Sequence, residues 1–135
     1  MAKFGRKEPI TFQIGPLDAT SSAVDATVFV VPDTGTGYIV ADVDSLQSTA
    51  SSSGTITLRK ITDTSAPGAS AGTTVVELTS AISTSSTANT RTSPTIVSNV
   101  VLKPGDHIAR KSGGTQTNLV GFVANVTLEP TAHVL

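Results

Sequence analysis

The amino-acid sequence predicts an all-β protein, an antiparallel two-sheet β-sandwich of the jelly-roll kind with about eight strands. Ser and Thr make up 16 and 22 of the 135 residues, and Thr favours strands whereas Ser favours turns and loops. The apolar runs are short and rich in β-branched residues, and clusters of Gly, Pro, Asn, Asp and Ser separate them. Such a pattern indicates a sandwich or barrel, and an immunoglobulin-like sandwich is the alternative to the jelly roll.

The length suits one domain, and the chain divides into an extended N-terminal arm, residues 1–9, and a single β-sandwich domain, residues 10–135. The predicted strands are, in chain order, residues 10–14, 27–31, 38–43, 55–62, 74–78 and on toward 82, 92–98, 107–111 and 119–128. Each is an apolar or β-branched run bounded by turn-forming residues. No helix of ordinary length fits between them.

Two of these strands show alternation with a period of two. In "TITLRKIT", Ile56, Leu58 and Lys60 face one way, and the residues between them face the other. In "LVGFVANVTL", every second residue belongs to one apolar set, which consists of Val120, Phe122, Ala124, Val126 and Leu128. We therefore expect these two strands to supply side chains to the core.

The segments between the strands carry turn chemistry. In "KPGD", Pro104 presets the backbone of the second turn position and Gly105 accepts a positive φ at the third, which predicts a type II turn. "DTGTGY" at residues 33–38 contains a Gly-x-Gly but no following helix or Lys that could hold a phosphate, so it predicts a hairpin turn. The Ser/Thr/Gly-rich residues 47–54 and 64–73 are interpreted as loops within one domain.

The net charge of −1 is distributed unevenly along the chain. Residues 1–7 carry three positive charges and no negative one, whereas residues 8–58 carry six acidic residues and no Lys or Arg. A basic arm on a near-neutral body suits an acidic patch on a protein partner, and no broad basic face for nucleic acid is expected. No apolar stretch approaches the ~20 residues of a membrane span, and no secretory signal is recognised, so we expect a soluble chain made in the cytoplasm without a membrane partner.

No reactive constellation is evident, and we expect no enzyme activity, no catalytic residue and no cofactor. The chain has no Cys, which excludes disulfides and thiolate sites. Asp106 precedes His107, but adjacent strand residues point to opposite faces, and no Gly-x-Ser-x-Gly elbow presents a serine. A surface histidine beside a turn is therefore the preferred interpretation, and a small hydrolase that uses His107 is the alternative.

Acidic residues in the first half raise the possibility of a calcium site. Asp42 and Asp44 would share one face of a strand, and Asp33 or Asp25 could add further oxygen ligands. Because no EF-hand spacing or Asp-rich repeat is present, a solvated acidic edge that prevents strand pairing is preferred. Two His and no Cys rule out the usual zinc sites, so no metal site is expected.

Aromatic residues are few, and most of them fit core positions. Phe12, Phe29 and Phe122 lie in strand patterns, which leaves Tyr38 and Phe4 as candidates for exposed contacts. A large apolar side chain in a basic, glycine-containing arm could anchor that arm in a partner's pocket. The alternative is that Phe4 packs onto its own domain.

The segments "SGTITLRKITDTSAPG" and "VVLKPGDHIARKSGGTQTNLVGFVANVTLEP" resemble small β-sandwich structural proteins of tailed bacteriophages. The shared sequence pattern lies within residues 37–129. It consists of a "TITL-K" strand, a Ser/Thr/Gly loop, a Thr-rich stretch that ends in "L-PGD-I", and a closing "LVG-V-V-L" strand. The resemblance implies a non-enzymatic virion component, namely a decoration (cement) protein on the capsid exterior whose partner is the major capsid protein. A tail or fibre component that binds a receptor or carbohydrate is the alternative.

We also expect the chain to associate with itself, around a three-fold axis or alternatively as a dimer. The arm is predicted to dock on a neighbouring protein through four residues, Lys3, Phe4, Arg6 and Lys7. Each exposed ion pair contributes only ~0–1 kcal/mol, whereas burying a Phe side chain contributes roughly 1.5–3 kcal/mol. Phe4 should therefore matter more than any single base.

Overall fold

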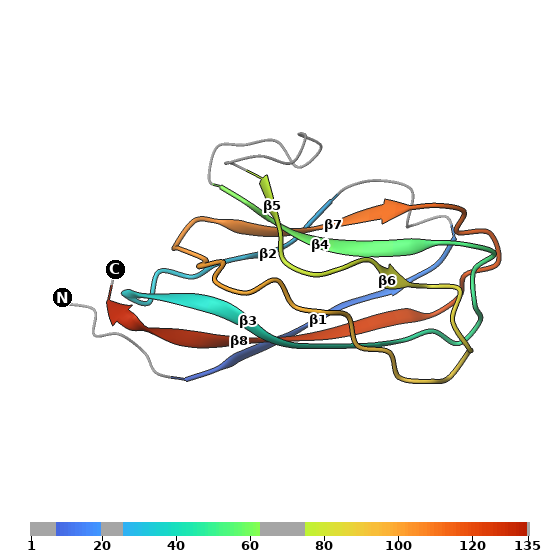
Figure 1. Cartoon of the computed structure of the whole chain (residues 1–135), viewed down its shortest axis with the longest axis horizontal. Coiled ribbons are helices and arrows are strands. Elements are labelled where there is room, and N and C mark those ends of the chain that lie inside the picture. Colours follow the sequence, from blue (N-terminus) through green and yellow to red (C-terminus); the bar gives the residue numbers. More distant parts are fainter. Residues whose placement is uncertain (1–7, 20–25, 63–74, 135) are drawn as a thin grey trace.

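The computed structural model describes residues 8–19, 26–62 and 75–134, and these residues form a two-layer antiparallel β-sandwich (Figure 1). The described part contains no helix, and therefore none that could span a membrane. Its strands are β1 (Ile10–Leu17), β2 (Ala26–Val30), β3 (Thr36–Leu46), β4 (Thr55–Ile61), β5 (Val75–Glu77), β6 (Ile82–Ser83), β7 (His107–Gly113) and β8 (Phe122–Val134). The predicted all-β sandwich is confirmed.

The order of the strands in the two sheets is that of a jelly roll. Sheet A has the order β1-β8-β3 and sheet B the order β2-β7-β4-β5, with β6 also paired to β4. The pairs β1–β8, β2–β7 and β4–β5 are nested inside one another, as in a long hairpin that is folded over into two layers. The fourth nested partner, beside β3, is the segment 92–102, which contacts β3 through isolated bridges at Thr92 and Leu102.

The prediction of a strand at residues 92–98 is wrong, because this segment crosses between the sheets instead of pairing with β3 along its length. Thr92 exchanges backbone hydrogen bonds with Ser45 of sheet A. A few residues later the segment bonds the edge of sheet B, where the N–H of Val97 donates to the carbonyl of Leu78 over 2.9 Å. Leu102 then returns to Tyr38 in sheet A. In Figure 1 this yellow-to-orange trace runs along the side between the two layers.

The core lies between the sheets, and the predicted alternation holds from Phe122 onward, whereas Val120 of the same predicted set precedes β8 and is 49% exposed. Phe122, Ala124, Val126 and Leu128 are buried, and the residues between them face outward. At the other edge of the sandwich, Phe12 of β1 stacks on Phe29 of β2 with ring centroids 4.2 Å apart. Since β1 and β2 belong to different sheets, this stack joins the two layers at their edge.

Strand β4 also follows its predicted alternation. Ile56 and Leu58 belong to the main core, whereas Ile61 forms a second, smaller buried cluster with Val75 and Ala109. Sheet B is therefore buried on one face along its length and locally on the other. The outward-facing Ile61 at the C-terminal end of β4 is thus buried as well.

The two turn predictions have different outcomes. At "KPGD", Gly105 has φ 88° and the N–H of Asp106 donates to the carbonyl of Lys103 over 3.0 Å, as a type II turn requires. At "DTGTGY" the chain does turn, with Gly35 at φ 79°, but β2 and β3 lie in different sheets. The connection therefore joins two layers, and the predicted hairpin is wrong.

Candidate functional site

The most extended exposed surface of sheet A is its outer face, which we call the A face. It consists of the outward side chains of three strands, namely Thr11, Gln13, Ile39, Asp42, Asp44, Leu46, Val123, Asn125, Thr127 and Glu129. These side chains alternate with buried ones along each strand, because successive residues of a strand point to opposite sides. The A face is therefore a by-product of the same pattern that builds the core.

The register of the strands arranges these side chains in rows across the sheet. Thr11, Thr127 and Asp42 form one row, and the hydroxyls of the two threonines lie 3.3 Å apart. Gln13, Asn125 and Asp44 form the next row. A register shift between Val40 and Asp42 leaves Ala41 as an extra exposed residue and brings Asp42 to the outside.

The A face is acidic. Three carboxylates lie along it, at Glu129, Asp42 and Asp44. Asp44 accepts a hydrogen bond from Ser93 Oγ over 2.6 Å, and its Oδ1 lies 3.7 Å from Nε of Arg91, whose side chain is 76% exposed. Asp42 forms no ion pair or side-chain hydrogen bond with any other described residue. Its charge is therefore available to an incoming cation.

One end of the A face is hollowed and apolar. A depression of about 340 Å³ is lined by Leu46 and Val123 together with Asp44, Ser45, Asn125 and Arg91. Leu46 is 38% exposed, which is high for a leucine in a strand. The depression thus combines an apolar floor with a carboxylate at its rim.

A second hollow, of about 450 Å³, lies where residues 96–100 swing away from β3. It is bounded by Ile39 and Glu129 on the sheet side and by Val97, which is 41% exposed, on the other. Neither hollow contains a nucleophile next to a base.

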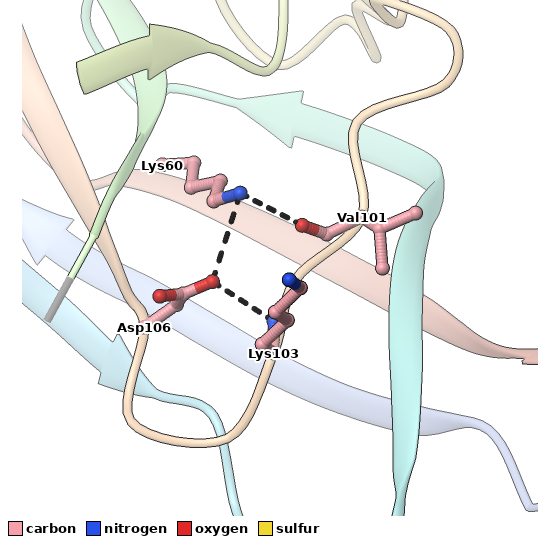
Figure 2. Close-up of polar contacts among 4 residues, drawn as sticks. All are labelled: Lys60, Val101, Lys103 and Asp106. Atoms are coloured by element: carbon pink, nitrogen blue, oxygen red, sulfur yellow. Dashed lines mark hydrogen bonds and ion pairs between the residues drawn. The ribbon is translucent and has the colours of Figure 1, made fainter. Parts of the chain in front are cut away.

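The largely buried ion pair of Asp106 and Lys60 holds the fold together. Asp106 Oδ2 accepts a hydrogen bond from the backbone N–H of Lys103 over 2.9 Å and lies 3.7 Å from Lys60 Nζ (Figure 2). Lys60 in turn donates to the carbonyl of Val101 over 2.9 Å. The side chain of Asp106 is 6% exposed. It therefore ties the "KPGD" turn to β4 and to the crossing segment.

The Asp106-His107 pair does not form the beginning of a triad. The Asp106 carboxylate is directed to Lys103 and Lys60, whereas Nδ1 of His107 lies 3.3 Å from the hydroxyl of Thr27. The expected separation of the two side chains is thus observed. His107 is partly exposed on the outer side of sheet B.

For the calcium alternative, Asp42 and Asp44 do share one strand face, as predicted. Asp33 lies in the turn before β3, and Asp25 is outside the described residues. Within residues 8–19, 26–62 and 75–134, no three His, Cys, Asp or Glu side chains are grouped so that they could hold a metal ion.

Of the residues predicted to contact a partner, the structure places none, because Lys3, Phe4, Arg6 and Lys7 all lie outside the described residues. Tyr38, the other aromatic expected to be exposed, is buried: it is 1% exposed, and its hydroxyl lies 2.8 Å from that of Thr34. That expectation was wrong, because the Tyr38 side chain belongs to the hydrophobic core between the sheets.

Sequence reasoning missed the depression at Leu46 and Val123. Val123 was recognised as outward-facing in β8, but the strand at β3 was predicted to end at residue 43, three residues before Leu46. Continuing the alternation of "DVDSL" would have placed Leu46 on the same side as Asp42 and Asp44.

Comparisons with known proteins add little to this geometry. No family model matches the chain, and no curated protein matches it. One similar solved chain is described as Bacillus endospore appendages that form a novel family of disulfide-linked pili, with 14% identity and a TM-score of 0.39 over 98% of this chain and 96% of that chain. A likeness at this level carries no argument about function.

Proposed function

We propose that this chain is a non-enzymatic structural protein of a tailed-phage virion, which decorates the capsid exterior and stabilises it by bridging neighbouring subunits. The observation that carries the proposal is the A face: a broad, exposed, acidic sheet surface in a chain whose N-terminal arm is basic. Complementary charges of this kind suit repeated protein-to-protein contacts. The resemblance of residues 37–129 to phage β-sandwich structural proteins is the reason for proposing a tailed-phage virion.

The proposed work of the chain is adhesion. A protein that binds the assembled shell, but not its separated subunits, stabilises the shell by mass action, and the effect grows with affinity and concentration. Copies that also contact one another gain avidity, because the second contact is made at a high effective concentration. Weak individual contacts are then sufficient to hold a lattice. In this proposal the arm, with Lys3, Phe4, Arg6 and Lys7, links each copy to a neighbouring protein.

The alternative of a receptor- or carbohydrate-binding tail component has lost support. It needed exposed aromatic residues, and Tyr38 is buried. The hollows of the described surface are lined by aliphatic and polar side chains rather than by aromatic rings. No observation favours this alternative over decoration.

The proposal is tested on bare capsids of a tailed phage whose purified particles contain this chain by mass spectrometry. The full chain is added, and co-sedimentation and the temperature of shell rupture are measured. We expect saturable binding and a higher rupture temperature. Binding to tails alone, or binding that leaves the rupture temperature unchanged, would refute the proposal.

A further inference from the structure

We propose that the A face is the docking site for residues 1–7 of a second copy of this chain, with Phe4 seated in the depression between Leu46 and Val123. This inference deepens the proposed function and rests on its claim that the arm links neighbours. It identifies the neighbour as another copy of the same protein.

The charges of the two surfaces are complementary. Residues 1–7 carry three bases and no acid. The A face carries the carboxylates of Glu129, Asp42 and Asp44, and Arg91 at its margin is the opposing charge. Asp42 and Asp44 belong to residues 8–58, which contain no Lys or Arg, and Glu129 adds a third carboxylate from β8.

The spacing of the arm also matches the spacing of the rows. Outward side chains of a strand repeat every second residue, or about 6.6–6.8 Å, and so do same-side residues of an extended peptide. With Phe4 at the Leu46 row, Arg6 falls at the next row, beside Asp44. Lys7, one residue later, points away from the A face in an extended peptide and adds its positive charge at longer range. Gly5 keeps the backbone between the two contacts free of a side chain.

The reach of the arm favours a second copy over its own domain. Ile10, where β1 begins, pairs with Leu128, and Val123 lies five residues further along β8, about 16–17 Å away. The depression is also displaced sideways, because it lies between β8 and β3. The six residues from Phe4 to Ile10 span at most about 20–22 Å when fully extended.

The direction of β1 also disfavours docking of the arm on its own copy. Strand β1 runs from Ile10 toward the end of β8 that contains Val123, so the chain enters β1 at the end of the sheet far from the depression. To reach the depression of its own copy, the arm would have to reverse direction, pass over the outward side chains of sheet A and run back along the sheet. The distance along β8 alone already takes up most of the span of about 20–22 Å, which disfavours such a reversal within one copy. A neighbouring copy has no such restriction.

The test uses complementary charge reversals in the full chain, with self-association measured by sedimentation equilibrium. Arg6→Glu with Lys7→Glu reverses the arm, and Asp42→Lys with Asp44→Lys reverses the A face. We expect each double variant to associate at least tenfold more weakly than the parent chain. An equimolar mixture of the two should associate, because the reversed arm then meets the reversed face.

Single substitutions sharpen the test. Phe4→Ala should weaken association at least tenfold, and Arg91→Ala should strengthen it, because Arg91 repels the incoming bases. Glu77→Lys is a matched control, since it reverses an exposed carboxylate on β5 of sheet B and should leave association unchanged. Thermal melting of every variant establishes that the fold is retained.

The outcomes separate this inference from the proposed function. A parent chain that stays monomeric, reversals without effect, or a mixture that does not associate would overturn the inference. If such a chain still binds capsids, decoration stands and only the arm-to-A-face contact fails. If the variants behave as expected but the parent chain does not bind capsids, the contact stands and the decoration proposal fails.

Discussion

Replacing Asp106 by alanine should destabilise the fold strongly, although the residue lies in a turn. Its side chain is 6% exposed and joins the "KPGD" turn to Lys60 of β4, which in turn binds the crossing segment. Losing it removes the acceptor of the Lys103 N–H and the counter-ion of Lys60, which keeps its hydrogen bond to the carbonyl of Val101 (Figure 2). Both losses act on groups that are largely shielded from water.

The expected magnitude follows from these contacts. A hydrogen bond to a charged group contributes about 1.5–3 kcal/mol, and the partly buried charge of Lys60 adds to the loss. The side chain of Lys60 is 18% exposed, so solvent screens part of its interaction with Asp106 at 3.7 Å. We therefore expect Asp106→Ala to lower the free energy of unfolding by about 2–4 kcal/mol, a large part of a typical 5–15 kcal/mol.

Equilibrium unfolding in urea measures this change as a lower midpoint at an unchanged slope. Lys103→Ala is the matched control, because Lys103 contributes its backbone N–H while its side chain is exposed. The control should change the free energy of unfolding by no more than about 0.5 kcal/mol. If Asp106→Ala were as mild as the control, or Lys103→Ala as severe as Asp106→Ala, the structural role of the carboxylate would be refuted.

Three other predictions concern the loops, the arm and assembly. Gln116→Ala should lower the free energy of unfolding, measured in urea, by about 2–4 kcal/mol. The reason is that the buried amide donates to the carbonyls of Thr55 and Gly113 and accepts from Thr84 Oγ1. A loss below about 1 kcal/mol would contradict this. Deleting residues 1–8 should leave the melting temperature unchanged in calorimetry but weaken binding to capsids, and equally tight binding by the truncated chain would exclude the arm as the link. The full chain should form a trimer, or else a dimer, in light scattering after size-exclusion chromatography, and a monomer both in solution and on the particle would refute self-association.

The fold was largely predictable because its strongest signals are local. Alternation in β8 and β4 identifies the core-facing side chains, and the Pro104-Gly105 pair identifies a type II turn. These patterns depend on neighbouring residues alone. The same reasoning failed at residues 92–98, whose β-branched composition suits a strand but whose backbone bonds are divided between Ser45 on one sheet and Leu78 on the other.

The A face could be predicted only in part. Alternation places Asp42 and Asp44 on one side of β3 and Asn125 and Thr127 on one side of β8. Their meeting in common rows depends on a pairing between segments more than 80 residues apart and on the register shift beside Ala41. Such long-range register is set by the packing of the whole sandwich, and no short stretch of sequence encodes it.

The burial of Tyr38 has the same kind of cause. Within its own strand the residue begins an alternating run and could face either side. Leu102, which lies 64 residues later in the numbering, exchanges two backbone hydrogen bonds with it, and both side chains belong to the core between the sheets. The exposed aromatic that a sugar-binding role needs is therefore absent at this position, for a reason that only the tertiary structure reveals.

The proposed decoration of capsids is tested most directly by electron cryo-microscopy of purified tailed-phage particles in which mass spectrometry detects this chain. The account predicts a density that fits the two-sheet jelly roll on the outer surface of the capsid, in contact with more than one capsid subunit. A density of this shape confined to the tail or its fibres, or its absence from the capsid surface, would contradict the account.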